Sequence, residues 1–227
     1  MLDTRSMTSA PILAQLGSVI SGVAIERDGA GACAVMVGDL NASGVLPREL
    51  TKVGPPKAGS DARLRAGDIV IALRGNGNFC AVVTSDLADQ EPVFATLDVA
   101  VIRLADECPV IPEYLTTYLN LPSTQLSLSQ HRSGTGALRL PLAPLKELQI
   151  PVPPGDRQSA IAALNTCAIK EQALVAQLSA LRTNLIHELL RQAAAEGPAK
   201  GIYPEQATTG PNGPGTTGRA LSTRAER

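Results

Sequence analysis

The segment Arg74-Gly75-Asn76-Gly77-Asn78 combines glycines with polar side chains, as loops that bind phosphate groups do. Its Gly-x-Gly step could begin the Gly-x-Gly-x-x-Gly pattern of dinucleotide-binding loops. The third glycine of that pattern is missing, because Cys80 stands at its position. We therefore interpret the segment as the tight turn of a hairpin, in which Asn76 and Gly77 adopt the positive φ of a type I′ turn.

Residues suited to catalytic or metal chemistry are few and scattered. The two histidines, His131 and His187, stand alone, and no two cysteines form a Cys-x-x-Cys pair that could bind zinc. No lysine has an acidic residue two positions before it, as the common nuclease core requires, and no Gly-x-Ser-x-Gly motif occurs. We therefore expect no catalysis, metal or cofactor in this chain. The cysteines, expected to be buried or partly buried thiols, are Cys33, Cys80, Cys108 and Cys167.

Charged residues are balanced over the whole chain but segregated along it. The 20 Lys and Arg residues against 21 Asp and Glu give a net charge of −1, so the chain as a whole does not attract nucleic acid. Residues 48–74 nevertheless hold six basic and three acidic residues, whereas 75–113 hold one and seven. Ordinary solvated charges and one positive face both stay open as interpretations. That face would consist of Lys52, Lys57, Arg63, Arg65, Arg74, Arg132 and Arg139.

The hydrophobic pattern predicts the elements that must position these residues. Runs rich in Val, Ile and Thr predict strands at 33–37, 68–73, 80–85 and 94–104, with turns at Gly75, Gly77 and Asp86–Glu91. Helices are expected at 112–120, where a proline occupies the first turn, and at 123–130, with Ser123 as N-cap. Further strands at 137–140 and 149–152 should flank a helical turn at 144–148.

Residues 156–194 contain neither Gly nor Pro and predict one helix, on the order of 55 Å long. Positions spaced by three and four residues form a mostly apolar seam that also includes Cys167, Glu171 and Glu188. The leucines of the seam are Leu164, Leu174, Leu178, Leu181 and Leu185. A coiled coil with a second helix and a single amphipathic helix packed on its own domain are both open.

The fold class expected is α+β, in three parts. Residues 1–154 form a β-rich domain, residues 155–195 a long coiled-coil helix, and residues 196–227 a disordered tail rich in Gly and Pro. No run reaches the roughly 18 apolar residues of a membrane helix, and no basic cluster precedes the apolar stretch 10–25. We expect a cytoplasmic protein without membrane contact. Aromatic residues at 2% and the absence of Trp argue against a base-stacking single-strand binder.

Two stretches, in this order, carry a family resemblance. Residues 64–83 read LRAGDIVIALRGNGNFCAVV, and residues 137–158 read ALRLPLAPLKELQIPVPPGDRQ before the long helix. Between them stand a helix motif with Pro112, Tyr114, Leu115 and Leu119, and a glycine-rich loop, Ser133-Gly134-Thr135-Gly136. Together these motifs resemble the specificity (S) subunit of type I restriction-modification systems, over roughly residues 12–192.

The resemblance implies one target-recognition domain with its spacer helix. Family members usually carry two of each, so this chain resembles a half-size form. The implied function is non-catalytic recognition of a DNA sequence through the major groove, where base edges differ in their donors and acceptors. The residues implied to read bases are Arg74, Asn76, Asn78, Arg132, Ser133 and Thr135. Those implied to contact phosphates are Lys52, Lys57 and Arg63.

The resemblance also implies partners. The spacer helix would pair antiparallel with that of a second copy through the seam leucines, and the homodimer would read a palindromic site in two halves. Methyltransferase (M) subunits would clamp onto the helix pair and methylate adenine. S-adenosylmethionine is expected on those subunits, not on this chain, and a restriction (R) subunit would join.

Two alternatives stay open. The chain could be a coiled-coil adaptor whose β-rich domain binds protein, or the recognition component of another phage-defence methylation system. Replacing Arg74 and Arg132 together separates the adaptor, because only a DNA reader would lose affinity and show a smaller dependence on salt. Neighbouring genes would separate the two defence systems.

Overall fold

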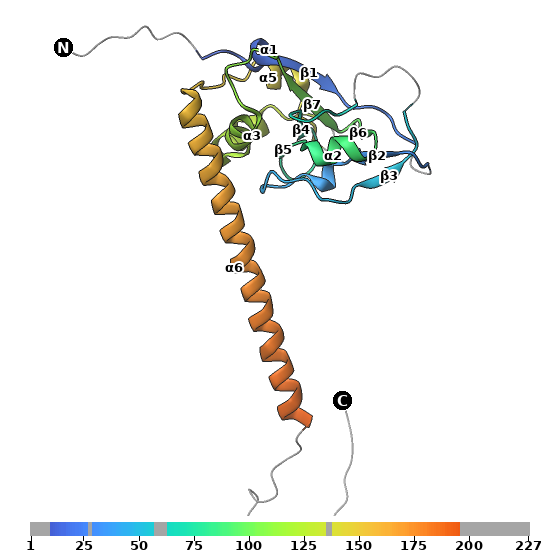
Figure 1. Ribbon diagram of the computed structural model, residues 1–227, viewed down its shortest axis with the longest axis vertical. Helices are drawn as coiled ribbons and strands as arrows, with labels where there is room; N and C mark the ends of the chain where they lie inside the picture. The colour runs from blue at the N-terminus through green and yellow to red at the C-terminus, as the bar shows by residue number, and fades with distance from the viewer. Residues whose placement is uncertain (1–9, 27–28, 57–62, 135–137, 196–227) are drawn as a thin grey trace, which may run out of the picture. The chain divides into compact units, whose positions relative to one another are not determined.

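The computed structural model describes residues 10–26, 29–56, 63–134 and 138–195 (Figure 1). The chain divides into two compact units, Met1–Val175 and Ala176–Arg227, and the division falls within the last helix. The tail expected at residues 196–227 lies outside the described residues. Among the helices of the described ranges, none has the length and apolar character needed to cross a membrane.

A four-stranded antiparallel sheet lies at the centre of the first unit. Its order is β1-β7-β4-β5, with β1 at Gly17–Ser21, β4 at Ile69–Ala72, β5 at Cys80–Val82 and β7 at Val99–Leu104. Strand β4 lies between two neighbours, since Val70 is opposite both Ala81 of β5 and Val101 of β7. Its uninterrupted apolar sequence suits this interior position, because both of its faces are covered.

A second, three-stranded sheet has the order β3-β2-β6. Its strands are β2 at Ala32–Val35, β3 at Thr51–Val53 and β6 at Val93–Ala95. Strand β2 is antiparallel to β3 and parallel to β6. The 3₁₀ helix η1, Val37–Asp39, follows β2, and helix α2, Ser85–Gln90, lies between β5 and β6.

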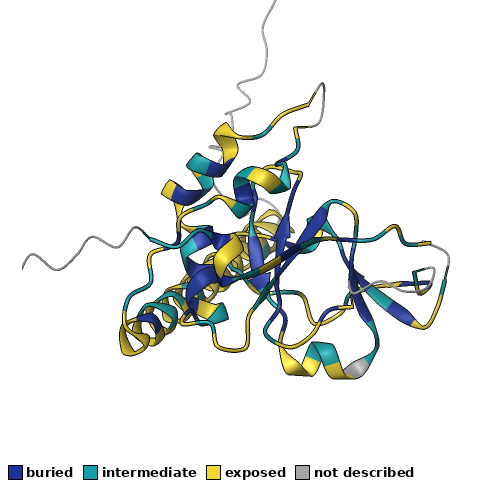
Figure 2. Cartoon of the chain, turned by 90° about the horizontal axis from the view of Figure 1, so that it is seen from above, coloured by how far each residue is buried: buried dark blue, intermediate teal, exposed yellow. Residues whose placement is uncertain are grey.

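Two apolar cores lie on the two faces of the four-stranded sheet. On one face, Ile69 and Ile71 pack with residues of helices α1 (Leu13–Leu16), α3 (Pro112–Asn120), α4 (Pro122–Gln130) and α5 (Leu142–Lys146). On the other face, Val70 and Ala72 pack with residues of the three-stranded sheet such as Val35. Successive side chains of a strand point to opposite faces, so β4 contributes to both cores. Figure 2 shows the strands buried and much of the helical surface exposed.

The expected single strand 94–104 is wrong, because it is two strands in different sheets. Strand β6 belongs to the three-stranded sheet, β7 belongs to the four-stranded sheet, and the chain turns between them at residues 96–98. The backbone N–H of Val99 donates to the carbonyl of Thr96 at 2.8 Å. The Thr96 hydroxyl donates to the carbonyl of Val35 at 3.2 Å, which holds the turn against β2.

Helix α3 occurs at residues 112–120, as expected, but several other boundaries differ. The predicted turn Asp86–Glu91 is largely helix α2, and strand 80–85 ends at Val82. Ser123 is not an N-cap, since α4 begins at Pro122 and has Leu121 as its N-cap. Helix α5 begins at Leu142, before the turn expected at 144–148.

The two short strands expected near the end of the domain are reduced to isolated bridges. Gln149 pairs with Ile12, and Arg139 pairs with Ser133. Ala137, the first residue of one predicted strand, lies outside the described residues. The expectation that all cysteines are at least partly buried is wrong for Cys167, which is exposed on the last helix.

Helix α6 spans Gly155–Ala195, the range expected for the long helix. Its first turns belong to the first unit, where Gln158 is 1% exposed and Ile161 packs against the core beside the helices. From residue 171 onward all described positions except Glu188 are exposed. Leu164 and Leu174, the seam leucines within the first unit, are therefore not covered by that unit.

Candidate nucleic-acid interface

Three segments that are distant in the sequence meet beside the hairpin of β4 and β5. The backbone N–H of Leu73 donates to the carbonyl of Asp98, and that of Leu140 donates to the carbonyl of Leu73, both at 2.8 Å. Ser133 and Arg139 exchange two backbone hydrogen bonds of 2.9 Å. The hairpin tip therefore lies close to the described residues on either side of 135–137, and the β6–β7 turn lies with them.

Two arginines share one carboxylate at this meeting point. Oδ1 of Asp98 lies 3.2 Å from Nε of Arg74 and 3.1 Å from Nη1 of Arg139. Arg139 also donates from Nη2 to the carbonyl of Leu97 at 2.9 Å. All three charged side chains are more than one-third exposed, so the group is accessible to a ligand and has a surplus positive charge.

Arg132 links the two predicted loops instead of extending freely into solvent. Its Nη2 donates to the carbonyl of Gly75 in the hairpin and to the carbonyl of Leu138 at 3.3 Å. Its Nε is buried and has no hydrogen-bond partner among the described residues. Arg132 therefore fixes the distance between the loops, as well as adding positive charge beside Arg74.

The remaining predicted base-reading residues differ in their exposure. Asn76 and Ser133 are exposed, whereas Thr135 lies outside the described residues. Asn78 is 1% exposed, and its side-chain amide donates to the carbonyl of Ala72 at 2.8 Å. The prediction that Asn78 reads a base is wrong for this conformation, because its side chain is buried within the hairpin.

The hairpin also bends at a different residue from the one predicted. Gly75 has a φ of 97°, and it is Gly75 rather than Gly77 that adopts positive φ among the described glycines of this turn. A side chain would be strained at such a φ. This turn brings the Gly75 carbonyl to Arg132, so it contributes directly to the link between the loops.

The predicted phosphate contacts lie elsewhere in the first unit. Lys52 is on β3 and contacts Glu91 at 3.5 Å, with its side chain 71% exposed. Arg63 forms an isolated bridge with Phe94 of β6. These contacts place Lys52 and Arg63 at the three-stranded sheet, not in the group around Asp98. Lys57 is outside the described residues.

The leucines of the seam on α6 are unusually exposed for their type. The exposed fractions are 73% at Leu164, 61% at Leu174 and 55% at Leu178, and they are similar at Leu181 and Leu185. Apolar exposure repeated along one helix face favours a partner helix over solvent. The interpretation that the seam packs on its own domain is wrong for Leu164 and Leu174, which lie within the first unit and are exposed there.

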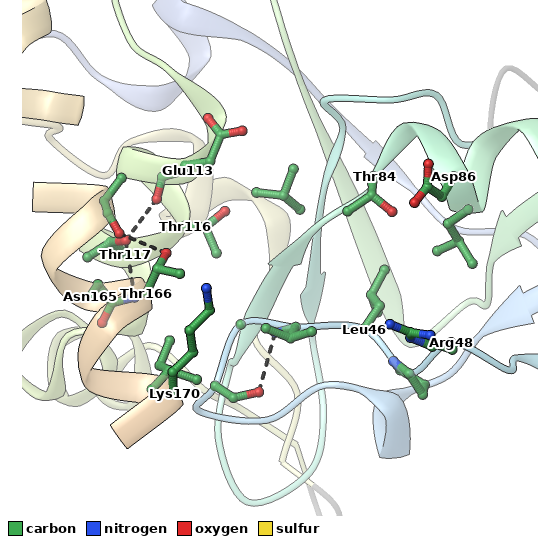
Figure 3. A pocket seen from close by; sticks show the side chains of 18 residues that line it. Leu46, Arg48, Thr84, Asp86, Glu113, Thr116, Thr117, Asn165, Thr166 and Lys170 are labelled. Atoms are coloured by element: carbon green, nitrogen blue, oxygen red, sulfur yellow. Dashed lines mark hydrogen bonds between the residues drawn. The ribbon is translucent and has the colours of Figure 1, made fainter. Parts of the chain in front are cut away.

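A groove of about 630 Å³ lies where the start of α6 faces the domain (Figure 3). Thr117 of α3 lies at one wall, where its hydroxyl donates to the carbonyl of Glu113 at 2.8 Å and accepts from the Asn165 amide at 3.3 Å. The described residues that line it include Arg48 and Lys170 but none of the predicted DNA-binding residues. The groove is thus separate from the arginine group.

Two of the described thiols, those of Cys33 and Cys80, are poorly suited to nucleophilic chemistry. Burial raises the pKa of the Cys80 thiol well above its usual value. Burial and the neighbouring Glu91 carboxylate raise the pKa of Cys33. Both thiols are therefore protonated near neutral pH and are poor nucleophiles. Within the described ranges, no three His, Cys, Asp or Glu side chains come together as a metal site would require.

Comparison with known proteins assigns the fold. No protein-family model and no curated protein matches the sequence. A chain from a type I R-M system, solved to explain complex assembly and conformational transition, matches 84% of this chain with a TM-score of 0.57 and 17% identity. The HsdS subunit from Thermoanaerobacter tengcongensis matches 86%, with a TM-score of 0.52 and 17% identity. The chain has the fold of a type I specificity subunit. It spans about half the length of these two chains, 46% of each.

The motifs that carry the resemblance hold this specificity-subunit fold together. Gly67 turns with a φ of 85° ahead of Asp68, which is 2% exposed. Arg103 of β7 donates to both Asp68 carboxylate oxygens, at 2.8 and 2.7 Å. This bidentate pair ties the entrance of β4 to β7. The sequence pattern indicates the Gly-Asp step but not its arginine partner, which is far away in the sequence.

Gln158 ties the start of α6 to neighbouring segments, as Asp68 and Arg103 tie β4 to β7. Its Oε1 accepts from the backbone N–H of Ile111 at 2.9 Å. Its Nε2 donates to the carbonyls of Pro109 and Pro153, at 2.7 and 2.8 Å. The side chain therefore satisfies three backbone groups from two segments.

Asp98 is the residue of the candidate site that was not predicted from the sequence.

Proposed function

We propose that this protein is a sequence-recognition subunit of a type I restriction-modification system, without catalytic activity of its own. The observation that carries the proposal is the specificity-subunit fold over more than four-fifths of the chain. It is supported by the accessible positive group formed by Arg74, Arg132 and Arg139 at the meeting point of two loops. The ligand is double-stranded DNA.

The proposed division of labour follows from exposure and charge. Arg74, Asn76 and Ser133 read base edges, since each is exposed and each can donate hydrogen bonds in the major groove. Lys52 and Arg63 contact phosphates at the three-stranded sheet and contribute to affinity but not to sequence choice. Lys57 and Thr135 stay in the proposal as sequence-based candidates.

The second part of the proposal is dimerisation through α6. Two copies pair antiparallel along the exposed leucine seam, and the pair separates two recognition domains. The homodimer has two-fold symmetry, so its target is a palindrome with a fixed gap. A methyltransferase subunit that carries S-adenosylmethionine binds the helix pair and methylates adenine, and a restriction subunit joins that complex.

Selection from a pool of DNA duplexes with a randomised centre tests the proposal. The full chain should enrich one motif made of two short blocks at a fixed spacing. Arg74→Ala should weaken binding to that motif and alter the preference at one position per block, because a single base-reading contact is lost. Arg157→Ala is the matched control, since Arg157 is exposed in the first turn of α6 and belongs to neither loop.

The same selection excludes the alternatives or supports them. A pool that emerges with no enriched sequence would contradict the proposal and favour a coiled-coil adaptor. An enriched motif made of a single block would keep DNA recognition and contradict the dimer. Salt titration adds an independent check, because the logarithm of affinity should fall linearly with the logarithm of salt concentration.

A further inference from the structure

Asp98 is an acidic residue in the middle of the group that we assign to DNA. It lies in the turn between β6 and β7, and Oδ1 contacts both Arg74 and Arg139. We propose that Asp98 is a positioning residue for base recognition: it holds the two guanidinium groups together, so that Arg74 presents its terminal nitrogens to DNA. This inference rests on the proposed function and adds a specificity role for a residue that does not itself contact DNA.

The contact with Asp98 leaves the two terminal nitrogens of Arg74 available for a ligand. The carboxylate contacts Nε, the inner nitrogen of the guanidinium group. Nη1 and Nη2 make no hydrogen bond with any residue in the described part of the chain. These two nitrogens form the fork with which arginine binds two acceptors at once, as in O6 and N7 of guanine or two phosphate oxygens.

Asp98 is itself held firmly. Its backbone carbonyl accepts from the N–H of Leu73, the residue before Arg74, at 2.8 Å. The turn is closed by the hydrogen bond from Val99 to Thr96. The carboxylate is therefore fixed relative to the backbone that carries Arg74, and it fixes a long side chain that is otherwise 44% exposed. Without that contact, many arginine rotamers would compete with the one that fits a base.

Simple electrostatics and positioning predict opposite results for Asp98→Asn. The substitution removes a negative charge from a DNA site, so electrostatics alone would strengthen binding to every duplex. Loss of positioning would instead reduce the preference for the selected motif, since a bidentate contact discriminates between bases. The sign of the change in preference therefore separates the two explanations.

The experiment measures dissociation constants of the full chain for the duplex selected from the random pool and for a scrambled duplex. The preference is the dissociation constant for the scrambled duplex divided by that for the selected duplex. We expect Asp98→Asn to reduce this ratio about tenfold or more. Asp98→Glu, which keeps the charge, should recover part of the ratio. In an Arg74→Ala background, Asp98→Asn should change the ratio little, because Asp98 acts through Arg74.

Asp106→Asn is the matched control, because Asp106 is exposed in the turn after β7 and forms no ion pair among the described residues. It makes the same change in charge and should leave the ratio unchanged. Thermal unfolding of each variant checks that the domain is folded. An unaltered ratio in folded Asp98→Asn would overturn the inference and leave the proposed function standing. If the unmodified chain prefers no duplex, both are overturned.

Discussion

Strand β4 and helix α6 are both rich in large apolar side chains, but these side chains have opposite environments. All four residues of β4 are at most 1% exposed, whereas the seam leucines of α6 are more than half exposed. In β4, alternate side chains serve two different cores, so both faces of the strand are covered. In α6, Gln158 is the only buried residue among those that the structure describes.

This difference separates the β-rich domain, which buries its own apolar surface, from the long helix, which leaves its apolar face exposed. The sheets and their covering helices bury their own apolar surface, which is what an independent domain requires. A helix with a repeated apolar face exposed to water lacks half of its packing. The long helix is therefore the place where a second chain should add stability, while the domain should be stable through its own core.

The largest expected effect is at the seam of α6. Replacing both Leu178 and Leu181 by Glu should convert a dimer into a monomer, because two charges per helix would be buried in each interface. Light scattering coupled to gel filtration measures the change as a halved mass. Glutamates at Ala176 and Ala180, which face the opposite side of the helix, are the matched control and should leave the dimer intact.

An unchanged mass in the leucine variant would contradict dimerisation through the seam. If that mass were the dimer's, the two copies would associate through another surface. If it were the monomer's, the seam would require a different partner chain. Either result would contradict a homodimer formed through α6.

A smaller effect is expected in the β-rich domain. Ile71→Ala should lower the free energy of unfolding by about 2–5 kcal/mol, because it leaves a cavity in a closely packed core. Urea unfolding followed by circular dichroism measures this change. Leu126→Ala is the control, since Leu126 is 63% exposed, and it should change the unfolding free energy little. Equal losses in both variants would contradict the burial of Ile71 in the core.

The third and smallest effect is expected at Gln158, near the start of α6. Gln158→Ala leaves the N–H of Ile111 and the carbonyls of Pro109 and Pro153 without their partner. We expect a loss of about 1–3 kcal/mol in the free energy of unfolding. Gln172→Ala, at an exposed position of the same helix, should have almost no effect. A harmless Gln158→Ala would mean that the helix begins independently of the domain.

Local patterns predicted much of the fold. Helices α3 and α6 and the strand core of β4 followed from proline placement, the absence of helix breakers and an apolar run between turn residues. The run 94–104 misled, because its two halves have the same composition and pair with different sheets. Asp98, the charged residue inside that run, was the available signal for a turn.

The candidate site was only partly predictable, because its contacts are long-range. The sequence indicates the polar loops at 74–78 and 132–135, and it places Arg74 and Arg132 in them. It does not indicate that both arginines are held by groups from other segments, or that Asn78 is buried. Such information depends on which strands pair, and pairing is not encoded near the loops themselves.

The most direct test of DNA sequence recognition is a map of adenine methylation across the genome of the host, with and without this gene. We predict that one palindromic motif with a fixed gap loses its methylation when the gene is removed and regains it when the gene is restored. Arg74→Ala should fail to restore it, whereas Arg157→Ala should succeed. A methylation map that is the same with and without the gene would contradict the account.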